Sequence, residues 1–305
     1  MIKKVAIIGF GRMGITHYSI INSHPNISVE SVVDTSSFVT DFLKKYTTVK
    51  TFNNYNILFK ESKPDAIIVC TPPSHHYSIL KLAAKNRIHV FCEKPFTTSK
   101  KDAEELAKTF KQLKLINQVG YVLRYNDCFK KAKTFIDNNL IGEATRFKMK
   151  KYSSTITSGG NSLGWRGSKK EGGGVLFEMG VHAIDLLIYF FGEPKKIIGS
   201  HLGRIFSDNV EDTVFSTFIY DKKLSGHIDI NWCDSSYRKP ISELEIYGEL
   251  GKLIVNEHSI KIFLDKENHK HSLRKGWNTL YITDVFNNVP FYVRGNEFTA
   301  QLYDF

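Results

Sequence analysis

The sequence has few cysteines and no long apolar run. Its 305 residues include four cysteines with no C-x-x-C spacing: Cys70, Cys92, Cys128 and Cys233. This pattern excludes a zinc knuckle or a paired redox motif, and it predicts a protein of the reducing cytoplasm. No apolar run approaches the roughly 20 residues of a membrane helix. The run Val5–Ile8 is too short for a secretory signal, so we expect a β-strand there.

The chain also lacks an arginine-rich arm and a helix-turn-helix pattern. Its net charge of +11 is spread along the sequence without a dense basic block. Such a charge attracts anionic ligands, but scattered lysines are more typical of solvated faces. We therefore expect no nucleic-acid partner and no membrane partner.

Short apolar runs alternate with helical stretches over residues 1–123. We expect strands at Val5–Ile8, Val29–Asp34, Ala66–Cys70, His89–Cys92 and Val119–Val122. Helices fall between them, for example Ser99–Leu113, where Ser99 can cap the first turn. Continuous Val/Ile runs that alternate with helices predict an α/β fold with a doubly wound parallel sheet, a Rossmann domain.

The pattern changes over residues 124–305. Helices are expected at Asp127–Asn138 and Val175–Phe191, and strands at Thr213–Tyr220, Leu224–Trp232 and Leu244–Tyr247. This predicts an α+β domain built on a large, mostly antiparallel open sheet. One face of such a sheet can pack on helices while the other meets a partner subunit. The last residues, from Asn296, begin an amphipathic helix.

A glycine-rich loop follows the first predicted strand and opens a helix. It reads Gly9-Phe10-Gly11-Arg12-Met13-Gly14. Glycines in this arrangement allow a tight turn and bring backbone N–H groups close to a pyrophosphate at the helix N-terminus. Asp34 ends the second strand, 20 residues after Gly14, where a carboxylate accepts hydrogen bonds from an adenosine ribose. The combination predicts a dinucleotide site.

The charge of Asp34 also bears on the choice of dinucleotide. A carboxylate repels a 2′-phosphate, and no arginine follows it in Thr35-Ser36-Ser37. We therefore expect NAD, with NADP less favoured. Arg12 in the loop leaves NADP open, because it can reach a phosphate.

With these residues in place, the chain resembles the Gfo/Idh/MocA family, of the glucose-fructose oxidoreductase and inositol dehydrogenase type, along its whole length. Besides the glycine loop, the resemblance rests on ordered motifs: Cys70-Thr71-Pro72-Pro73 with His76, Glu93-Lys94-Pro95, Gly120-Tyr121-Val122-Leu123-Arg124-Tyr125, Trp165-Arg166 before Gly172-Gly173-Gly174, and Gly180-Val181-His182-Ala183-Ile184-Asp185.

The resemblance implies roles for several of these residues. In the family, the lysine of the Glu-Lys-Pro turn, here Lys94 beside Glu93, reaches the nicotinamide ribose and the substrate hydroxyl. Independently of the resemblance, Lys94 follows a predicted strand at the carboxyl edge of the sheet, where ligands bind in doubly wound folds. Cofactor contacts are also implied for a second set of residues: Thr71, Pro72, His76, Glu93, Trp165 and Arg166.

A polar stripe interrupts the apolar helix after residue 175. Glu178, His182 and Asp185 are spaced i, i+4 and i+7, which places them on one face of an α-helix. A metal site is a third interpretation beside a core histidine and a catalytic site, but hydride transfer needs no metal, so we expect none. The family usually has aspartate at position 178, so the role of this glutamate stays open.

These residues suggest a mechanism. We expect His182 to take the proton of a substrate hydroxyl, Lys94 to stabilise the developing alkoxide, and Glu178 to orient His182, while the hydride passes to NAD. For Arg124, contact with a substrate anion and an interdomain ion pair are both open. Asp185 is a further expected substrate contact. Tyr237 is also a candidate, although a plain surface loop is the favoured interpretation there.

The expected function is NAD(P)-dependent hydride transfer between the nicotinamide and a hydroxyl of a sugar, polyol or nucleotide sugar. The alternatives are a non-catalytic dinucleotide sensor, or a reductase of a non-sugar substrate such as a biliverdin-like or diol compound. The resemblance implies a homodimer or homotetramer formed through the C-terminal sheet. Neither the named substrate nor the direction of transfer follows from these motifs.

Overall fold

The computed structural model describes residues 2–157, 163–221, 223–290 and 295–305. They form two compact units, one of Met1–Tyr121 with Val289–Phe305 and one of Val122–Asn288. The first boundary lies two residues from the expected one. The final residues, expected in the second domain, belong instead to the first unit.

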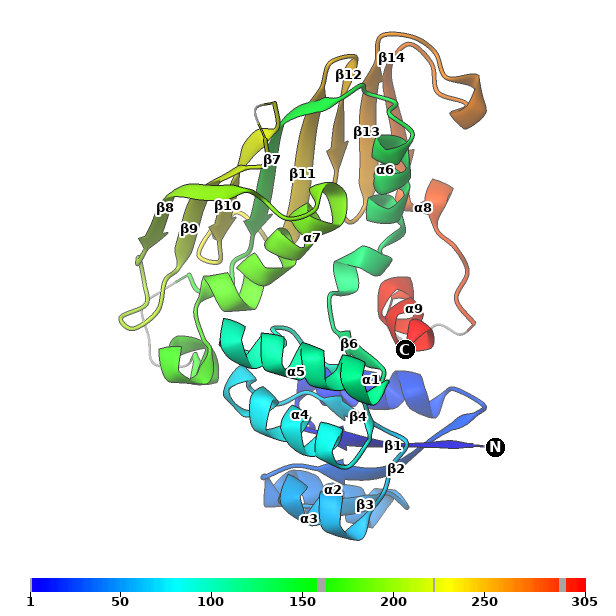
Figure 1. The fold of residues 1–305 in the computed structure, drawn as a ribbon, viewed down its shortest axis with the longest axis vertical. Helices are drawn as coiled ribbons and strands as arrows, with labels where there is room; N and C mark the ends of the chain where they lie inside the picture. Colours follow the sequence, from blue (N-terminus) through cyan, green and yellow to red (C-terminus); the bar gives the residue numbers. More distant parts are fainter. Residues whose placement is uncertain (1, 158–162, 222, 291–294) are drawn as a thin grey trace. The chain divides into compact units, whose positions relative to one another are not determined.

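The first unit contains a parallel sheet of six strands in the order β3-β2-β1-β4-β5-β6 (Figure 1). The strands are β1 Lys3–Ile8, β2 Ile27–Val33, β3 Lys50–Phe52, β4 Ala66–Val69, β5 His89–Cys92 and β6 Asn117–Val119. This is the strand order of a dinucleotide-binding Rossmann sheet. Val122, expected in the last strand, instead begins a 3₁₀ turn, Val122–Tyr125.

Helices cover both faces of this sheet. They are α1 Arg12–Asn22, α2 Ser37–Tyr46, α3 Tyr55–Glu61, a 3₁₀ turn Pro73–His75, α4 His76–Lys85, α5 Lys100–Leu113 and α9 Asn296–Asp304. Alternate residues of β1 enter two separate cores: Ala6 and Ile8 pack with Leu80 and Phe110, and Ile7 packs with Ile20. Burial on both faces explains the continuous apolar runs of these strands.

The C-terminal helix α9 packs within the first unit. Leu302 joins the core that contains Ile20 of α1, and the Phe305 ring lies 6.0 Å from that of Phe91. Gln118 in β6 donates a hydrogen bond to the carbonyl of Gln301 at 3.0 Å. A segment far along the chain therefore completes the core beside the glycine-loop helix.

The second unit contains an eight-stranded sheet in the order β14-β13-β12-β11-β7-β10-β9-β8. Every neighbouring pair is antiparallel except β7 and β10, so the prediction of a mostly antiparallel sheet is confirmed. The strands are β7 Ala144–Tyr152, β8 Lys196–Gly203, β9 Thr213–Ile219, β10 Ser225–Asn231, β11 Ile241–Gly248, β12 Gly251–Val255, β13 Ser259–Leu264 and β14 Gly276–Tyr281.

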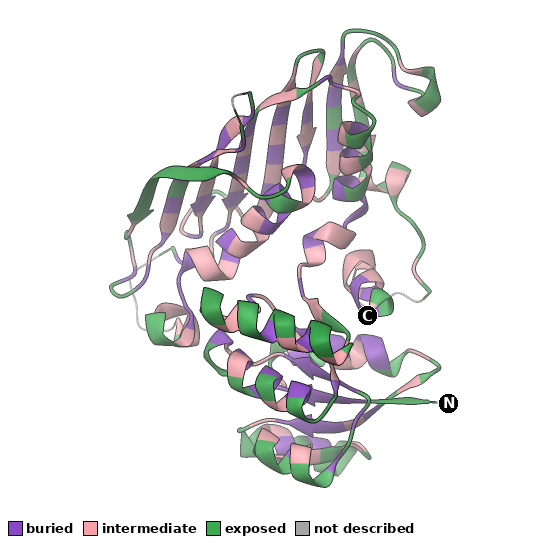
Figure 2. Cartoon of the chain, viewed as in Figure 1, coloured by how far each residue is buried: buried purple, intermediate pink, exposed green. Residues whose placement is uncertain are grey.

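One face of this sheet is buried and the other is open. Buried and partly exposed residues alternate along the central strands, as the banding in Figure 2 shows. The buried face packs with α6 Asp127–Asp137 and α7 Val181–Phe191 in one apolar core. The remaining helical segments are short: Gly164–Gly167, Lys169–Glu171, Leu176–Gly180, His269–His271 and α8 Ile282–Val285.

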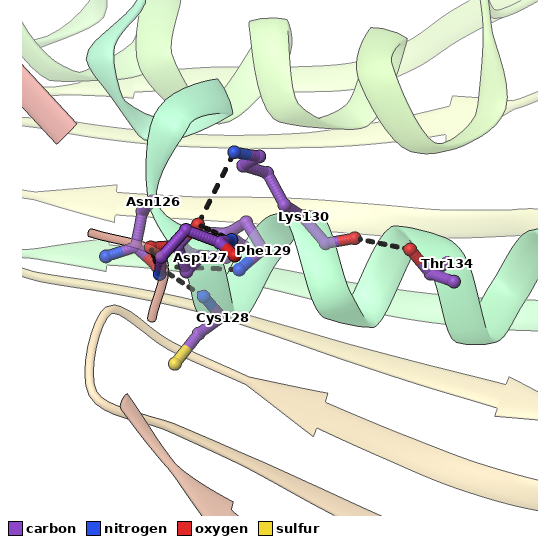
Figure 3. A network of polar contacts seen from close by, with 7 residues as sticks. Asn126, Asp127, Cys128, Phe129, Lys130 and Thr134 are labelled. Carbon is purple, nitrogen blue, oxygen red and sulfur yellow. Dashed lines mark hydrogen bonds and ion pairs between the residues drawn. The ribbon is translucent and has the colours of Figure 1, made fainter. Parts of the chain in front are cut away.

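The N-terminus of α6 is tied down by polar contacts (Figure 3). The Asn126 side chain caps the helix by accepting from the backbone of Cys128 at 3.0 Å. The neighbouring Asp127 accepts from the backbone of Asn287 at 2.9 Å and pairs with Lys130 at 3.4 Å. The chain just after Arg124 is therefore fixed in position by capping and charge.

A π-helical turn, Leu176–Gly180, precedes α7. The expected regular helix over 175–191 is therefore wrong in its first turn. The wider stretch Lys169–Phe191 is long and apolar enough to cross a membrane by length and composition. This differs from the expectation that no apolar run approaches the length of a membrane helix. Half of the most apolar part of this stretch is buried inside the structure. Val175, Leu186 and Leu187 are fully buried in the unit's core, as in a core helix.

Glu211, in the segment just before β9, is hydrogen-bonded to the start of this helix. The Glu211 carboxylate accepts from the backbone N–H of Leu176 at 3.0 Å, and the Glu211 carbonyl accepts from Val175. Next to it, the fully buried Asp212 accepts hydrogen bonds from the Trp232 indole at 2.7 Å and the Ser207 hydroxyl at 2.5 Å, and from the backbone N–H of Ile205. The carboxylate of Asp212 thus fastens the segment to the sheet.

We predict that Asp212→Asn lowers the stability of the fold. Burial opposes ionisation of Asp212, but the hydrogen bonds from Ser207, Trp232 and the backbone outweigh it and lower its pKa to about 2. Because the pKa is about 3.9 in an unfolded chain, ionisation contributes about 2 kcal/mol above pH 4. Denaturant unfolding should show this loss in the variant at pH 7.

The pH dependence of this stability difference serves as the control. The difference between wild type and Asp212→Asn should shrink as the pH falls towards 2, where the wild-type carboxylate becomes protonated. An equal difference at pH 7 and pH 2.5 would contradict the role assigned to the ionised carboxylate.

Candidate functional site

The glycine loop packs tightly against the end of β4. Gly9 has φ +91°, and a Cβ there would lie 2.8 Å from the backbone of Cys70. A Cβ on Gly14 would lie 2.1 Å from the carbonyl oxygen of Gly9. A Cβ on Gly11 would meet no atom within 4 Å. Two glycines are therefore required by the fold, whereas Gly11 keeps open the space through which a pyrophosphate approaches the backbone.

The first turn of α1 is suited to an anion. Gly11 is its N-cap, and no side chain caps it. Asp34 shapes the loop from the end of β2: one carboxylate oxygen accepts from Phe10 N at 2.7 Å and the other from Ser36 N at 2.8 Å. Asp34, the carboxylate predicted to bind the ribose, thus lies beside the loop predicted to bind the pyrophosphate. This carboxylate and the backbone N–H groups of the loop fit a dinucleotide.

The Glu93-Lys94-Pro95 turn is joined to α1 by a residue that the sequence analysis missed. His17 is fully buried in α1, and its Nε2 donates to Oε1 of Glu93 at 2.6 Å. Gly120 leaves room for this carboxylate, because a Cβ there would lie 3.1 Å from Oε2. The signal in the sequence for this contact is a histidine three residues after Gly14, the last glycine of the loop. The contact therefore links the helix after the glycine loop to the turn that contains Lys94.

His76 also acts on this turn from inside the core. Its ring is fully buried, with Nδ1 2.8 Å from the carbonyl oxygen of Pro95 and Nε2 2.9 Å from that of Thr71. Burial lowers its pKa, although these backbone contacts oppose the shift. The expectation that His76 contacts the cofactor is therefore replaced: it ties the Thr71 loop to the Lys94 turn. Contacts of Thr71 and Pro72 with a cofactor stay predictions.

Among the polar residues of the second unit's helix, Glu178 pairs with an arginine. Its Oε1 accepts from Arg166 Nε at 3.0 Å, and the Arg166 guanidinium lies 4.7 Å from the Trp165 ring. The close approach of Gly173 to the Arg166 carbonyl, where a Cβ would lie at 2.1 Å, explains the glycine run. Trp165, Arg166 and Glu178 therefore form one group beside the π turn.

Glu178 lies in the π turn, whereas His182 and Asp185 lie in the regular helix α7. The placement of all three side chains on one face of the helix stays a prediction. π turns of this kind are frequent at functional sites.

Asp185 is engaged by Arg124 in a two-pronged ion pair. Arg124 Nε lies 2.8 Å from Oδ2, and Nη2 lies 2.7 Å from Oδ1. Both residues belong to the second unit, so this ion pair is not an interdomain one. Asp185 fixes the direction of the Arg124 guanidinium. Contacts of Asp185 and Arg124 with a substrate stay predictions.

Tyr237 lies in the turn after β10. Its ring packs edge-on against Tyr152 at 5.2 Å, and its carbonyl accepts from Ser154 at 2.6 Å. The hydroxyl of Tyr152 donates to Asp229, and both side chains alternate to the face away from the helices. Tyr237 therefore packs against Tyr152 of the open face, and its contact with a substrate stays a prediction.

The described residues give little support for metal-dependent chemistry or for a nucleophilic cysteine. No group of three His, Cys, Asp or Glu side chains that suits a metal ion occurs in the described parts of the chain. Burial raises the pKa of the Cys70 and Cys92 thiols well above their usual range, which disfavours a nucleophilic thiolate.

Two sequence models of one protein family match the chain. The model described as an oxidoreductase family with an NAD-binding Rossmann fold matches residues 3–121, and that of the Gfo/Idh/MocA C-terminal domain matches residues 129–254. The myo-inositol 2-dehydrogenase of Thermotoga maritima is 25% identical over 194 residues, 63% of this chain and 56% of that protein. The chain spans about half the length of the first curated relatives it matches.

Solved structures share the fold. A levoglucosan dehydrogenase in complex with NADH and levoglucosan has a TM-score of 0.86 at 18% identity, covering 99% of this chain and 88% of that one. The WlbA dehydrogenase from Bordetella pertussis, in complex with NADH and UDP-GlcNAcA, has a TM-score of 0.82 at 18% identity, covering 88% and 79%.

Two glycine variants should separate cofactor binding from folding. Gly11→Ala should keep the wild-type melting temperature, because its Cβ enters open space, but weaken NADH binding at least about tenfold by blocking the pyrophosphate. Gly14→Ala should lower the melting temperature by several degrees, because its Cβ meets the Gly9 carbonyl. Fluorescence titration with NADH and thermal unfolding measure both effects. Unchanged NADH affinity in a folded Gly11→Ala would refute the assigned cradle.

Proposed function

Because this chain belongs to the Gfo/Idh/MocA oxidoreductase family, we propose that it transfers a hydride between a hydroxyl-bearing carbon of a sugar, polyol or nucleotide sugar and NAD. The observation that carries the proposal is the tie between the cofactor loop and the catalytic turn. His17 in the helix after the glycine loop holds Glu93, the residue before Lys94. A site for NAD alone does not require a lysine fixed in this way.

Residues of the first unit hold the cofactor in this proposal. The backbone of the glycine loop and the first turn of α1 bind the pyrophosphate, and Asp34 binds the adenosine ribose. The carboxylate disfavours a 2′-phosphate, which selects NAD over NADP. When bound, the nicotinamide accepts or donates the hydride.

Proton and charge are handled by Lys94 and His182. The Lys94 ammonium stabilises the negative charge that develops on the substrate oxygen. His182 takes the hydroxyl proton, since an imidazole with a pKa near ~6.5 can act as a base at neutral pH. Arg124 is paired with Asp185 and Arg166 is paired with Glu178, so both carboxylates of this helical segment are neutralised by arginines. In this arrangement Glu178 acts on the helix through Arg166.

A lysine exchange tests the catalytic assignment. Lys94→Ala should lower turnover at least about a thousandfold, because the alkoxide loses its stabilising charge, while NADH affinity changes little. The matched control is Lys100→Ala at the start of α5, whose side chain is 89% exposed. NADH absorbance over a panel of polyols, aldoses and UDP-sugars gives the rates. Full turnover by Lys94→Ala would overturn the assignment. Tight NADH binding by wild type with no turnover on any substrate would favour the sensor.

We also propose that the open face of the eight-stranded sheet joins copies of this chain. Large apolar side chains are exposed on its outer strands, among them Phe215 in β9 and Trp277 in β14. The four cysteines are unpaired, which fits a cytoplasmic assembly held by packing and not by disulfides. An apolar surface of this kind on a stable sheet is typical of a subunit interface.

Light scattering tests this second proposal. The wild type should elute as a dimer or tetramer, and Trp277→Glu combined with Phe215→Glu should shift it towards the monomer, because buried charges oppose association. Phe38→Glu, on the exposed face of α2 in the first unit, is the control and should leave the mass unchanged. A wild-type monomer at micromolar concentration would contradict the proposal.

A further inference from the structure

A cavity lies at the edge of the parallel sheet opposite to the glycine loop. It has a volume of about 510 Å³ and is lined by the segments that lead into β4 and β5. Asp65 immediately precedes β4 and His89 begins β5, and the backbone N–H of His89 donates to the Asp65 carbonyl at 3.2 Å. Ligands of doubly wound sheets bind at the other edge, beyond the carboxyl ends of the strands. The cavity is therefore separate from the site described above.

Three cations line this cavity without an acidic partner. Lys63 belongs to the first segment, and Lys85 and Arg87 belong to the second. In the described parts of the chain, no carboxylate forms an ion pair with any of them. Asp65 is the one acidic residue among the described residues of the lining, and its carboxylate is already engaged. It accepts from a backbone N–H at 2.8 Å and lies 3.8 Å from the Lys3 ammonium. The cavity therefore has an excess of positive charge.

A fixed hydrogen-bond donor and an unpaired hydroxyl complete the lining. His89 Nδ1 accepts from the backbone N–H of Ile116 at 3.0 Å, so the neutral ring has its proton on Nε2. No residue that the structure describes accepts a hydrogen bond from this nitrogen. Ser62, which also lines the cavity, is 6% exposed, and its hydroxyl has no hydrogen-bond partner among the described residues. Polar groups without a partner at the wall of a cavity indicate a ligand that supplies one.

We propose that this cavity binds a small molecule that carries a diphosphate group. Phosphate oxygens accept from guanidinium, ammonium and imidazole N–H groups, and these are the donors that line the cavity. A phosphate monoester has a charge of about −1.5 to −2 at pH 7, which is less than the combined charge of Lys63, Lys85 and Arg87. Two linked phosphates therefore match the three cations more closely than one phosphate does. The inference goes beyond the proposed function, because no residue of the hydride-transfer site lines the cavity.

Calorimetric titration with inorganic pyrophosphate tests the inference. The protein is first saturated with NADH, so that the glycine loop is occupied and cannot bind the probe. We expect one pyrophosphate to bind per chain, and inorganic phosphate to bind at least about tenfold more weakly. A parallel titration with ADP distinguishes a nucleotide from the inorganic ion as the source of the diphosphate group. Binding of either one to the NADH complex supports the site.

Substitutions then locate the bound anion. Arg87 has φ +57°, a left-handed conformation that glycine adopts without strain, so Arg87→Gly should keep or raise the melting temperature. Its affinity for pyrophosphate should fall at least about tenfold, because a charged hydrogen-bond donor is lost. Lys114→Gly is the matched control. It removes a cation from a second left-handed position, with φ +54°, that does not line the cavity, and it should bind pyrophosphate like wild type.

Three results would overturn the inference. The first is that neither pyrophosphate nor ADP binds to the NADH complex of wild type. The second is equal pyrophosphate affinity in wild type and Arg87→Gly. The third is pyrophosphate that binds to the protein alone but not to its NADH complex, since that probe occupies the glycine loop. Should Arg87→Gly fail to fold, the double variant Lys63→Gln with Lys85→Gln decides, and an unchanged affinity in it overturns the site as well. Hydride transfer is measured separately by NADH formation.

Discussion

One hydrogen bond, from His17 to Glu93, ties together the parts of the first unit that the proposed chemistry requires. It joins the helix that follows the glycine loop to the turn that contains Lys94. His76 secures the same turn from its other side, through the carbonyls of Pro95 and Thr71. Side chains locked by buried contacts of this kind give a catalytic group the positional accuracy that catalysis demands.

In the second unit, ion pairs fix the positions of side chains. Arg124 and Arg166 engage Asp185 and Glu178 on either side of His182 in the sequence, and Asp212 with Glu211 secures the start of the helix. An Arg–carboxylate pair with two parallel hydrogen bonds fixes direction as well as charge. The π turn between these contacts sets Glu178 apart from the regular helix and leaves His182 on its first turn.

The sequence predicted the parallel sheet and the glycine loop because both depend on local patterns. Buried strands such as Ala66–Val69 are continuous apolar runs, and Gly9 and Gly14 occupy positions that no larger residue can fill. The π turn was not predictable, since a backbone hydrogen-bond register leaves no mark on polar spacing. Lys151 in β7 resembles the surface lysines around it in the sequence, and only the strand register places it on the buried face of the second unit's sheet. The return of α9 to the first unit involves contacts between residues far apart in the sequence, such as Gln118 and Gln301, which are 183 residues apart.

The proposed function depends on hydride transfer between a hydroxyl-bearing carbon and the nicotinamide. Sugars labelled with deuterium at each ring carbon in turn, incubated with NAD and the enzyme, test this transfer directly when the cofactor is analysed by mass spectrometry. One labelled position, and no other, should deliver a single deuterium to the nicotinamide ring. Unlabelled NADH from every labelled substrate, or tight binding of NAD with no reduction at all, would contradict it.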